Sequence, residues 1–109
     1  MPCIFCDIID RKKPAKIFFD DTDLIVIADI LPRAAIHLLV IPRLHVTTLM
    51  DLPDELLLKM IARIRLMAKE LSVEDNFRVI LNNGAKAGQI IDHLHFHFLS
   101  NADRHVTYR

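Results

Sequence analysis

The sequence predicts an α+β domain, in which a five-stranded antiparallel sheet carries one long and one short helix. Short apolar runs rich in Ile, Val, Phe and Leu recur along the chain between turn residues, which is typical of strands. A long stretch that begins near Asp51 repeats its apolar residues at helical spacing. The length of 109 residues, with 52% hydrophobic, suits one domain over residues 1–109.

The first half of the chain is expected to form a short helix and three strands. The helix covers residues 4–11 and ends before Pro14, because its apolar residues recur at helical spacing: Ile4, Phe5, Ile8 and Ile9. The first two strands cover residues 17–19 and 24–27, and the polar run between them predicts a hairpin turn: Asp20, Asp21, Thr22 and Asp23. A third strand is expected over residues 37–41, stopped by Pro42.

The second half is expected to begin with the long helix. Asp51 is the predicted N-cap, Pro53 lies in the first turn, and Asp54 adds favourable negative charge there. A broad apolar stripe faces the core, with part of it left for a partner subunit: Leu56, Leu57, Met60, Ile61, Ile64, Met67, Ala68 and Leu71. Strands over residues 77–81 and 92–99 follow, and residues 104–108 form a short edge strand or an extended tail.

Three of the six histidines alternate within the last predicted strand, at His93, His95 and His97. Because strand side chains alternate in direction, the three imidazoles share one face of the strand, and neighbouring imidazoles lie about 7 Å apart. A solvated sheet face or an adventitious metal site would also explain this pattern. The opposite face takes the intervening apolar residues: Leu94, Phe96 and Phe98. Neutral imidazole is a good nucleophile toward phosphorus, so His95, flanked by histidines on both sides, is the predicted nucleophile.

A polar loop precedes this strand and contains both glycines of the chain, Gly84 and Gly88. Backbone amides in such a turn can hold an anion, and Asn82 and Gln89 add neutral donors. The loop carries no Walker-type lysine motif, so it is not a P-loop. An ordinary hairpin loop is the alternative, but pairing of the last two strands would place this loop beside the histidines and favours a phosphate site.

The two cysteines form a Cys-x-x-Cys pair, Cys3 and Cys6. In a cytosolic protein such a pair indicates a metal site or redox chemistry, and the two residues ahead of Cys3 are too few for the redox motif. Two thiolates and two histidines complete a tetrahedral zinc site, for which four histidines are candidates: His37, His45, His93 and His105.

Charge and hydropathy exclude several functions. The formal net charge is +0 at a pI near 7.0, so nucleic-acid binding by bulk charge is not expected. Apolar runs are too short to span a bilayer, and residues 1–7 lack the features of a signal peptide. We therefore expect no membrane partner and a cytoplasmic location.

These motifs together resemble the histidine triad (HIT) superfamily of nucleotide hydrolases and transferases, in particular the small Hint-like (protein kinase C interacting protein-like) nucleoside phosphoramidases of the bacterial zinc-containing type. The resemblance covers nearly the whole chain and rests on residues 3–9, 28–32, 37–45, 82–84, 88–89 and 93–99.

The resemblance implies an activity and a set of site residues. His95 would attack the α-phosphate of a purine nucleoside phosphoramidate, and water would release the nucleoside monophosphate. His97 would bind the phosphate, and Asp29 the ribose hydroxyls. The apolar walls of the base pocket would be Ile4, Phe5, Ile8, Ile27, Ile30 and Leu39, although plain core packing explains these residues equally well. The groups near the phosphate would be Asn82, Gly88 and Gln89.

The resemblance also implies a structural zinc ion held by Cys3, Cys6, His45 and His93, and a homodimer with a continuous ten-stranded sheet. His93 is then either a zinc ligand or the orienting partner of His95. The sequence departs from the family at Ile90, where many relatives have Ser or Thr, at the Ser100–Asn101 pair, and in the tail. A dinucleoside polyphosphate hydrolase on the same fold and a non-catalytic nucleotide-binding scaffold are the alternatives.

Overall fold

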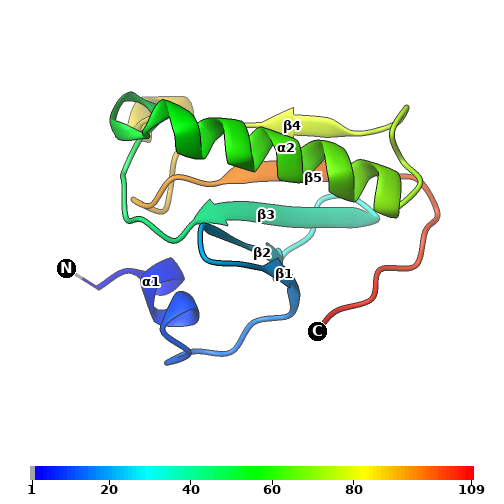
Figure 1. The fold of residues 1–109 in the computed structure, drawn as a ribbon, viewed down its shortest axis with the longest axis horizontal. Helices are drawn as coiled ribbons and strands as arrows, with labels where there is room; N and C mark the ends of the chain where they lie inside the picture. The colour runs from blue at the N-terminus through cyan, green and yellow to red at the C-terminus, as the bar shows by residue number, and fades with distance from the viewer. Residues whose placement is uncertain (1) are drawn as a thin grey trace.

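A single antiparallel sheet organises the molecule in the computed structural model, which describes residues 2–109. Met1, where the predicted domain begins, lies outside the described residues. The five strands are β1 (Ile17–Asp20), β2 (Leu24–Ala28), β3 (Ile36–Pro42), β4 (Arg78–Ile80) and β5 (Phe96–Ser100), in the order β1-β2-β3-β5-β4. The two α-helices are α1 (Ile4–Ile9) and α2 (Asp54–Glu70) (Figure 1). The predicted α+β class is confirmed.

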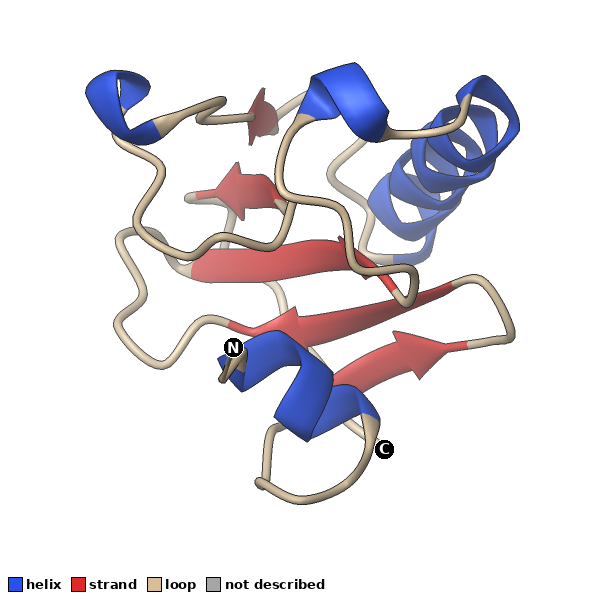
Figure 2. Ribbon diagram, turned by 90° about the vertical axis from the view of Figure 1, so that its left-hand side faces the viewer, coloured by secondary structure: helices blue, strands red, loops and turns tan. Residues whose placement is uncertain are grey.

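The two faces of the sheet bury different clusters of apolar side chains. The helices α2 and α1 lie on opposite faces of the sheet (Figure 2). Alternate residues of β2 and β3 pack on these two faces, as the period of two requires. The α1 face is the smaller one and packs Phe5, Ile8, Ile25, Ile27, Leu39 and Ile41. By the same alternation, His37 of β3 and His97 of β5 lie on the α1 face, because His97 is paired with Leu39. This face therefore carries the polar site.

The hairpin between β1 and β2 closes as the polar run predicts. The Asp21 carboxylate accepts hydrogen bonds from the backbone N–H groups of Asp23 and Leu24 at 2.8 and 2.9 Å. Such a bond replaces the water that these turn amides would otherwise need. The predicted turn is confirmed.

The predicted start of the long helix is wrong by one short turn. Asp51 belongs to a separate 3-10 turn, η1 (Leu49–Asp51), and α2 starts at Asp54 with Pro53 as its N-cap. Proline fixes the backbone dihedral for helix entry but provides no capping side chain, so the acidic first turn of α2 supplies the favourable charge instead.

The histidine-bearing strand is shorter than predicted. β5 begins at Phe96, so His93 and His95 precede the hydrogen-bonded ladder. Pro42, the last residue of β3, has no N–H to donate to a longer ladder, and its carbonyl accepts from the His93 side chain at 2.8 Å. The Leu94 N–H turns to the Val46 carbonyl at 2.8 Å. The alternation nevertheless persists, since Leu94, Phe96 and Phe98 all pack into the α2 face.

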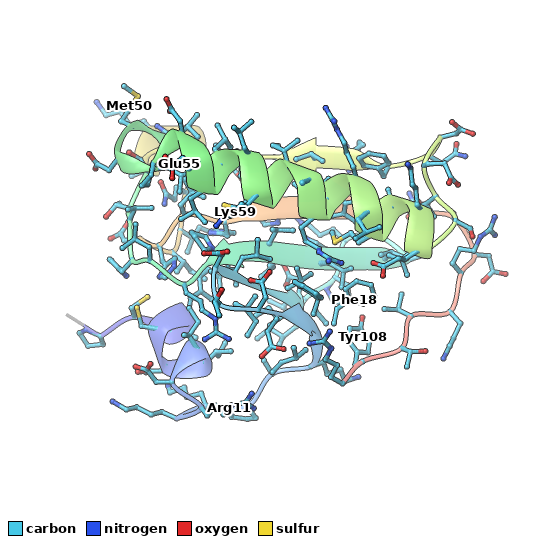
Figure 3. All side chains as sticks on the ribbon, viewed as in Figure 1. Arg11, Phe18, Met50, Glu55, Lys59 and Tyr108 are labelled. Atoms are coloured by element: carbon cyan, nitrogen blue, oxygen red, sulfur yellow. The ribbon has the colours of Figure 1, made fainter. Side chains whose placement is uncertain are left out.

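Other strand limits differ slightly from the predictions. β3 gains a residue at each end, β4 loses one at each end, and α1 stops at Ile9. The tail after β5 forms no strand within residues 101–109, so the extended-tail alternative holds. It returns along β1, where the Arg109 N–H donates to the Ile17 carbonyl, and Tyr108 lies beside this edge (Figure 3).

None of the helices described in residues 2–109 has the length and apolar character of a membrane span.

Candidate active site

A cavity of about 480 Å³ opens on the α1 face of the sheet, between α1, the loop after β2 and the loop before β5. It gathers ten of the residues that the sequence predicted for catalysis or substrate binding: Phe5, Ile8, Ile27, Asp29, Ile30, Leu39, Asn82, Gly88, His95 and His97. These residues come from five separate segments of the chain. Their convergence on one concave surface is typical of a small-molecule site.

Two other predicted contacts lie outside this cavity lining. Gln89 is buried and braces the glycine loop: its side-chain oxygen accepts from the Gly84 N–H at 2.8 Å, and its amide donates to the carbonyls of Thr47 and Ile91. Its hydrogen-bonding capacity is therefore largely spent on the protein. Ile4 lies on the exposed side of α1.

The glycine loop presents its backbone to the cavity at Gly88. This residue has φ of +92°, a left-handed conformation that glycine adopts without strain. A Cβ atom added there would come within 3.4 Å of the Asn82 side-chain nitrogen. The Asn82 amide in turn donates to the Ala87 carbonyl at 2.9 Å, and this hydrogen bond within the loop stabilises its conformation.

The protonation of His95 follows from its backbone contact. Its Nδ1 lies 2.9 Å from the His93 carbonyl oxygen, which can only accept, so Nδ1 carries the proton and Nε2 keeps its lone pair. Burial lowers the pKa of His95, against smaller raising effects of this hydrogen bond and of Asp29. The ring is therefore neutral at physiological pH and offers a nucleophilic nitrogen.

His97 carries its proton on the other nitrogen. The Arg33 backbone N–H donates to His37 Nδ1 at 3.1 Å, so His37 Nε2 is protonated and donates to His97 Nδ1 at 2.9 Å. The Arg33 guanidinium, which has no acceptor, also faces His97 Nδ1 at 3.5 Å. His97 is therefore an Nε2–H donor, the opposite tautomer of His95.

The pKa values of these rings keep them neutral. Burial lowers the pKa of His97 to about 4, with further lowering by His95, His37 and Arg33. Burial also lowers the pKa of His37, although Asp29 raises it in part. Asp29 Oδ2 lies 3.3 Å from His37 Nε2, and its Oδ1 accepts from the Leu31 N–H at 2.9 Å. The carboxylate is thus held at the edge of the cavity.

Sequence reasoning missed Arg33 and offered His37 only as one of four candidate zinc ligands. His37 is in contact with His97 only because β3 pairs with β5, and no local pattern states that pairing. Arg33 is an isolated cation in a loop, so its sequence context carries no signal. The ligand-type atoms of Asp29, His37 and His97 also lie within 4.8 Å of one another. The Arg33 cation beside them favours a hydrogen-bonded chain rather than a second metal site.

Four metal-ligand side chains meet at the N-terminal end of α1. The ligand atoms of Cys3, Cys6, His45 and His93 all lie within 4.8 Å of one another. His93 Nδ1 is 3.4 Å from Cys3 Sγ and 3.6 Å from Cys6 Sγ, and His45 Nδ1 is 3.3 Å from Cys6 Sγ and 3.1 Å from His93 Nδ1. His37 and His105, also candidate ligands in the sequence, are not part of this cluster.

The donor set fits a zinc ion. His93 Nε2–H donates to the Pro42 carbonyl, which leaves the Nδ1 lone pair directed at the thiols. Burial lowers the pKa of His93 and so favours the neutral ligand form. Burial also raises the pKa of the Cys6 thiol to about 11, with Cys3 adding to the rise, and a dication at this point would offset that effect. Two thiolates and two imidazoles form a closed tetrahedral set.

Comparisons with known proteins agree with this geometry. The HIT domain family matches residues 10–104. A HIT-like protein of Chlamydia trachomatis serovar D is 41% identical over 102 residues, covering 91% of this chain and 92% of that protein. The crystal structure of a HIT family hydrolase from Legionella pneumophila superposes with a TM-score of 0.88 at 32% identity, covering 94% of this chain and 95% of the other.

A Zn-bound histidine triad family protein from Mycobacterium smegmatis superposes with a TM-score of 0.82 at 34% identity, over 94% of this chain and 77% of the other. Its metal belongs to that protein, but the four-residue cluster of this chain offers a matching donor set. The extent of the family match and the identities above 30% place the whole sheet and its histidines in one family. The chain belongs to the HIT family.

Proposed function

We propose that this protein hydrolyses purine nucleoside phosphoramidates at the α-phosphate, through a nucleotidyl intermediate on His95. The observation that carries the proposal is the pair of opposite tautomers in one cavity. His95 offers the Nε2 lone pair, whereas the neighbouring His97 offers an Nε2–H, and their ring centroids are 5.0 Å apart. One group can attack phosphorus while the other stabilises a phosphoryl oxygen.

The chemistry balances with water as the only co-reactant. The His95 Nε2 lone pair forms a bond to phosphorus as the phosphorus–nitrogen bond to the leaving amine breaks. The departing nitrogen takes up a proton from water and leaves as an amine. Water then attacks the phosphorus, its proton passes to solvent, and the bond to His95 breaks to release the nucleoside monophosphate. The Arg33 guanidinium and the His97 N–H face the charge that develops on the phosphoryl oxygens.

The rest of the cavity suits a nucleoside. The Asp29 carboxylate lies at its edge and can accept hydrogen bonds from a ribose diol. The buried apolar side chains of Phe5, Ile8, Ile27 and Leu39 form a wall against which a flat base can pack. The name of the Legionella relative, a HIT family hydrolase, supports hydrolysis as the reaction class.

Zinc completes the proposal as a structural ion. Cys3, Cys6, His45 and His93 would hold it, and a closed four-ligand set supplies a cross-link rather than a reactive position. His93 then serves catalysis indirectly, because its carbonyl oxygen sets the tautomer of His95. We also propose a homodimer as the working form.

The test compares wild-type protein with His95→Ala on a fluorogenic adenosine phosphoramidate. We expect kcat to fall at least about 1000-fold, because the nucleophile is removed, while adenosine monophosphate still binds in calorimetry. His105→Ala is the matched control, since His105 is exposed and lies outside the cavity lining.

Three results would contradict the proposal. Unchanged turnover in His95→Ala would remove the nucleophile from the mechanism. A wild-type protein that binds the monophosphate without turnover would be a nucleotide-binding scaffold instead. Much faster hydrolysis of a diadenosine polyphosphate than of the phosphoramidate would reassign the substrate class on the same fold.

A further inference from the structure

The cysteine pair and part of the catalytic cavity wall belong to the same short helix. Cys3 is the N-cap of α1 and Cys6 lies in its first turn, whereas Phe5 and Ile8 of this helix are buried and line the cavity. α1 lies against the face of the sheet opposite α2 (Figure 2). A change in how the first turn of α1 is held therefore affects the wall of the proposed base site.

Two sets of contacts join this turn to the site histidines. The Phe5 ring lies edge-on to His93 and His95, with ring centroids 5.8 and 5.1 Å apart. His93 Nδ1 lies 3.4 and 3.6 Å from the two sulfurs, while the His93 carbonyl oxygen faces His95 Nδ1 at 2.9 Å. His93 thus contacts both the cysteine pair and the proposed nucleophile.

The two sulfurs are placed for oxidation by a small oxidant. Cys3 and Cys6 are the only cysteines of the chain, both are partly exposed, and their Sγ atoms lie within 4.8 Å of each other. Residues three apart share one side of a helical turn, so rotation of the two side chains can bring the sulfurs to bonding distance. Zinc ligands are thiolates, which is the form that hydroperoxides oxidise.

We propose that Cys3 and Cys6 are a reversible oxidation site, which hydrogen peroxide converts to an intrachain disulfide with release of the zinc ion and weaker nucleotide binding. The inference rests on the zinc site and the nucleotide cavity of the proposed function, but not on hydrolysis. Hydrogen peroxide is small enough to reach sulfurs that a larger thiol reagent does not reach while the metal is bound.

The oxidation balances with peroxide as the only oxidant. One thiolate sulfur attacks a peroxide oxygen, the oxygen–oxygen bond breaks, and the departing hydroxide takes a proton from solvent to give water and a sulfenic acid. The second thiolate attacks the sulfenic sulfur, the sulfur–sulfur bond forms, and a second hydroxide leaves and is protonated to water. The two sulfurs lose two electrons in total, which the peroxide gains.

The disulfide removes the attachment of α1 to the rest of the site. Its sulfurs carry no thiolate charge to hold a zinc ion, so His45 and His93 are no longer cross-linked to the first turn. A six-residue helix has little stability of its own, and its Phe5 and Ile8 side chains then form a less ordered wall. Cellular thiols can reduce the disulfide again, as is usual for transient disulfides in the cytosol.

The experiment treats zinc-loaded wild-type protein with hydrogen peroxide. A colorimetric indicator measures released zinc, peptide mass spectrometry without reduction detects the disulfide, and calorimetry measures the Kd for adenosine monophosphate after the peroxide is removed. We expect about one zinc released per disulfide formed. The Kd should rise about tenfold, because part of the apolar wall is lost, and dithiothreitol followed by zinc should restore it.

Cys6→His is the matched variant. Imidazole also binds zinc, so three histidines and Cys3 still form a four-ligand set, but an intrachain disulfide can no longer form. The same treatment should leave the zinc content and the Kd of this variant near their untreated values.

Met50→Leu is the control for methionine oxidation. Met50 is 83% exposed and comes from η1, away from the cavity lining (Figure 3). Dithiothreitol does not reverse methionine sulfoxide as it reverses a disulfide. The variant should therefore respond to peroxide and to dithiothreitol as wild-type protein does.

The outcomes separate this inference from the proposed function. A disulfide that leaves zinc bound, or that leaves the Kd unchanged, would overturn the inference and leave the hydrolase intact. Sulfinic acid or disulfides between chains in place of the intrachain disulfide would also overturn it, as would an equal loss of affinity in Cys6→His. Reduced, zinc-loaded protein that binds no adenosine monophosphate would overturn the proposed function and this inference with it.

Discussion

At the scale of single residues, the site distinguishes chemically identical side chains by what each Nδ1 atom contacts. His95 Nδ1 meets a carbonyl, which accepts, whereas His97 Nδ1 meets His37 and Arg33, which donate. A hydrogen bond on one ring nitrogen decides the state of the other, so the same residue type keeps a free lone pair in one place, as the proposed nucleophile, and offers an N–H in the next. His37, buried under Asp29, is a positioning residue in this arrangement.

The lowered pKa of His97 predicts a loss of stability in acid. Its folded-state pKa of about 4 lies below the ordinary value of 6.5, so the unfolded chain binds a proton more readily between these pH values. The stabilisation is therefore complete above about pH 6.5 and is lost as the pH falls toward 4. His97→Gln should make the urea midpoint fall less steeply between pH 7 and pH 4.5.

Urea unfolding followed by circular dichroism at several pH values measures this effect. His105→Gln is the control, because that histidine is exposed and its loss should leave the pH dependence of the wild-type protein in place. An identical pH dependence in His97→Gln and wild-type protein would show that His97 does not titrate abnormally.

At the scale of elements, α1 depends on contacts beyond its own length. It spans six residues, and only Phe5 and Ile8 are buried. A helix so short has little intrinsic stability in water. Its N-cap is Cys3, whose sulfur accepts from the Cys6 N–H at 3.4 Å, so the first turn of the helix presents both thiols together. As the proposed zinc ligands, His45 and His93 would attach this turn to the segments that follow β3 and precede β5.

Zinc removal is therefore expected to loosen α1. Protein purified without chelators should contain about one zinc per chain by elemental analysis. A strong chelator should lower Tm by at least about 5 °C, because metal binding contributes to the folded state alone. Both thiols should become reactive toward a thiol reagent only after the metal is removed.

Cys6→Ser should reproduce the lower Tm and show no further effect of the chelator, which separates metal loss from other actions of the reagent. Metal-free protein whose two thiols react freely before any chelator is added would contradict the zinc site.

At the scale of the whole molecule, the two edges of the sheet differ. The tail covers the β1 edge, where the Arg109 guanidinium donates to the Asp20 carboxylate at 2.6 Å in addition to the backbone bond to Ile17. β4 is the opposite edge, and Val79 there is exposed. An uncovered edge strand is a place where a second chain can pair.

This asymmetry predicts how the proposed dimer forms. Wild-type protein should elute with a light-scattering mass of about 25 kDa, twice the 12.6 kDa chain. Val79→Glu should shift the mass toward the monomer, since paired edges would bring two like charges together. Leu44→Glu, an exposed site after β3, is the control and should remain dimeric. A wild-type monomer at high concentration, or a dimer unaffected by Val79→Glu, would contradict pairing at β4.

The local pattern of the sequence was sufficient to predict the fold class and several of the candidate site residues. The alternation of apolar residues defined the strands and the faces of the histidine segment, and residue chemistry singled out the nucleophile candidate and the cysteine pair. The confirmed fold class rests on these local signals, whereas most of the ten predicted residues that meet in one cavity were implied by the family resemblance. The local signals are readable because side-chain direction repeats with the period of the backbone.

The tertiary structure decided what depends on pairing between distant segments. The register of β3 with β5 brought His37 to His97. The Pro42 carbonyl accepts from the His93 side chain outside the ladder, which begins at Phe96, and the Gln89 side chain holds its own loop. Each of these outcomes depends on which backbone group finds which partner across the sheet. The sequence by itself determined which residues could do chemistry, whereas long-range hydrogen bonding decided the tautomers and contacts with which they do it.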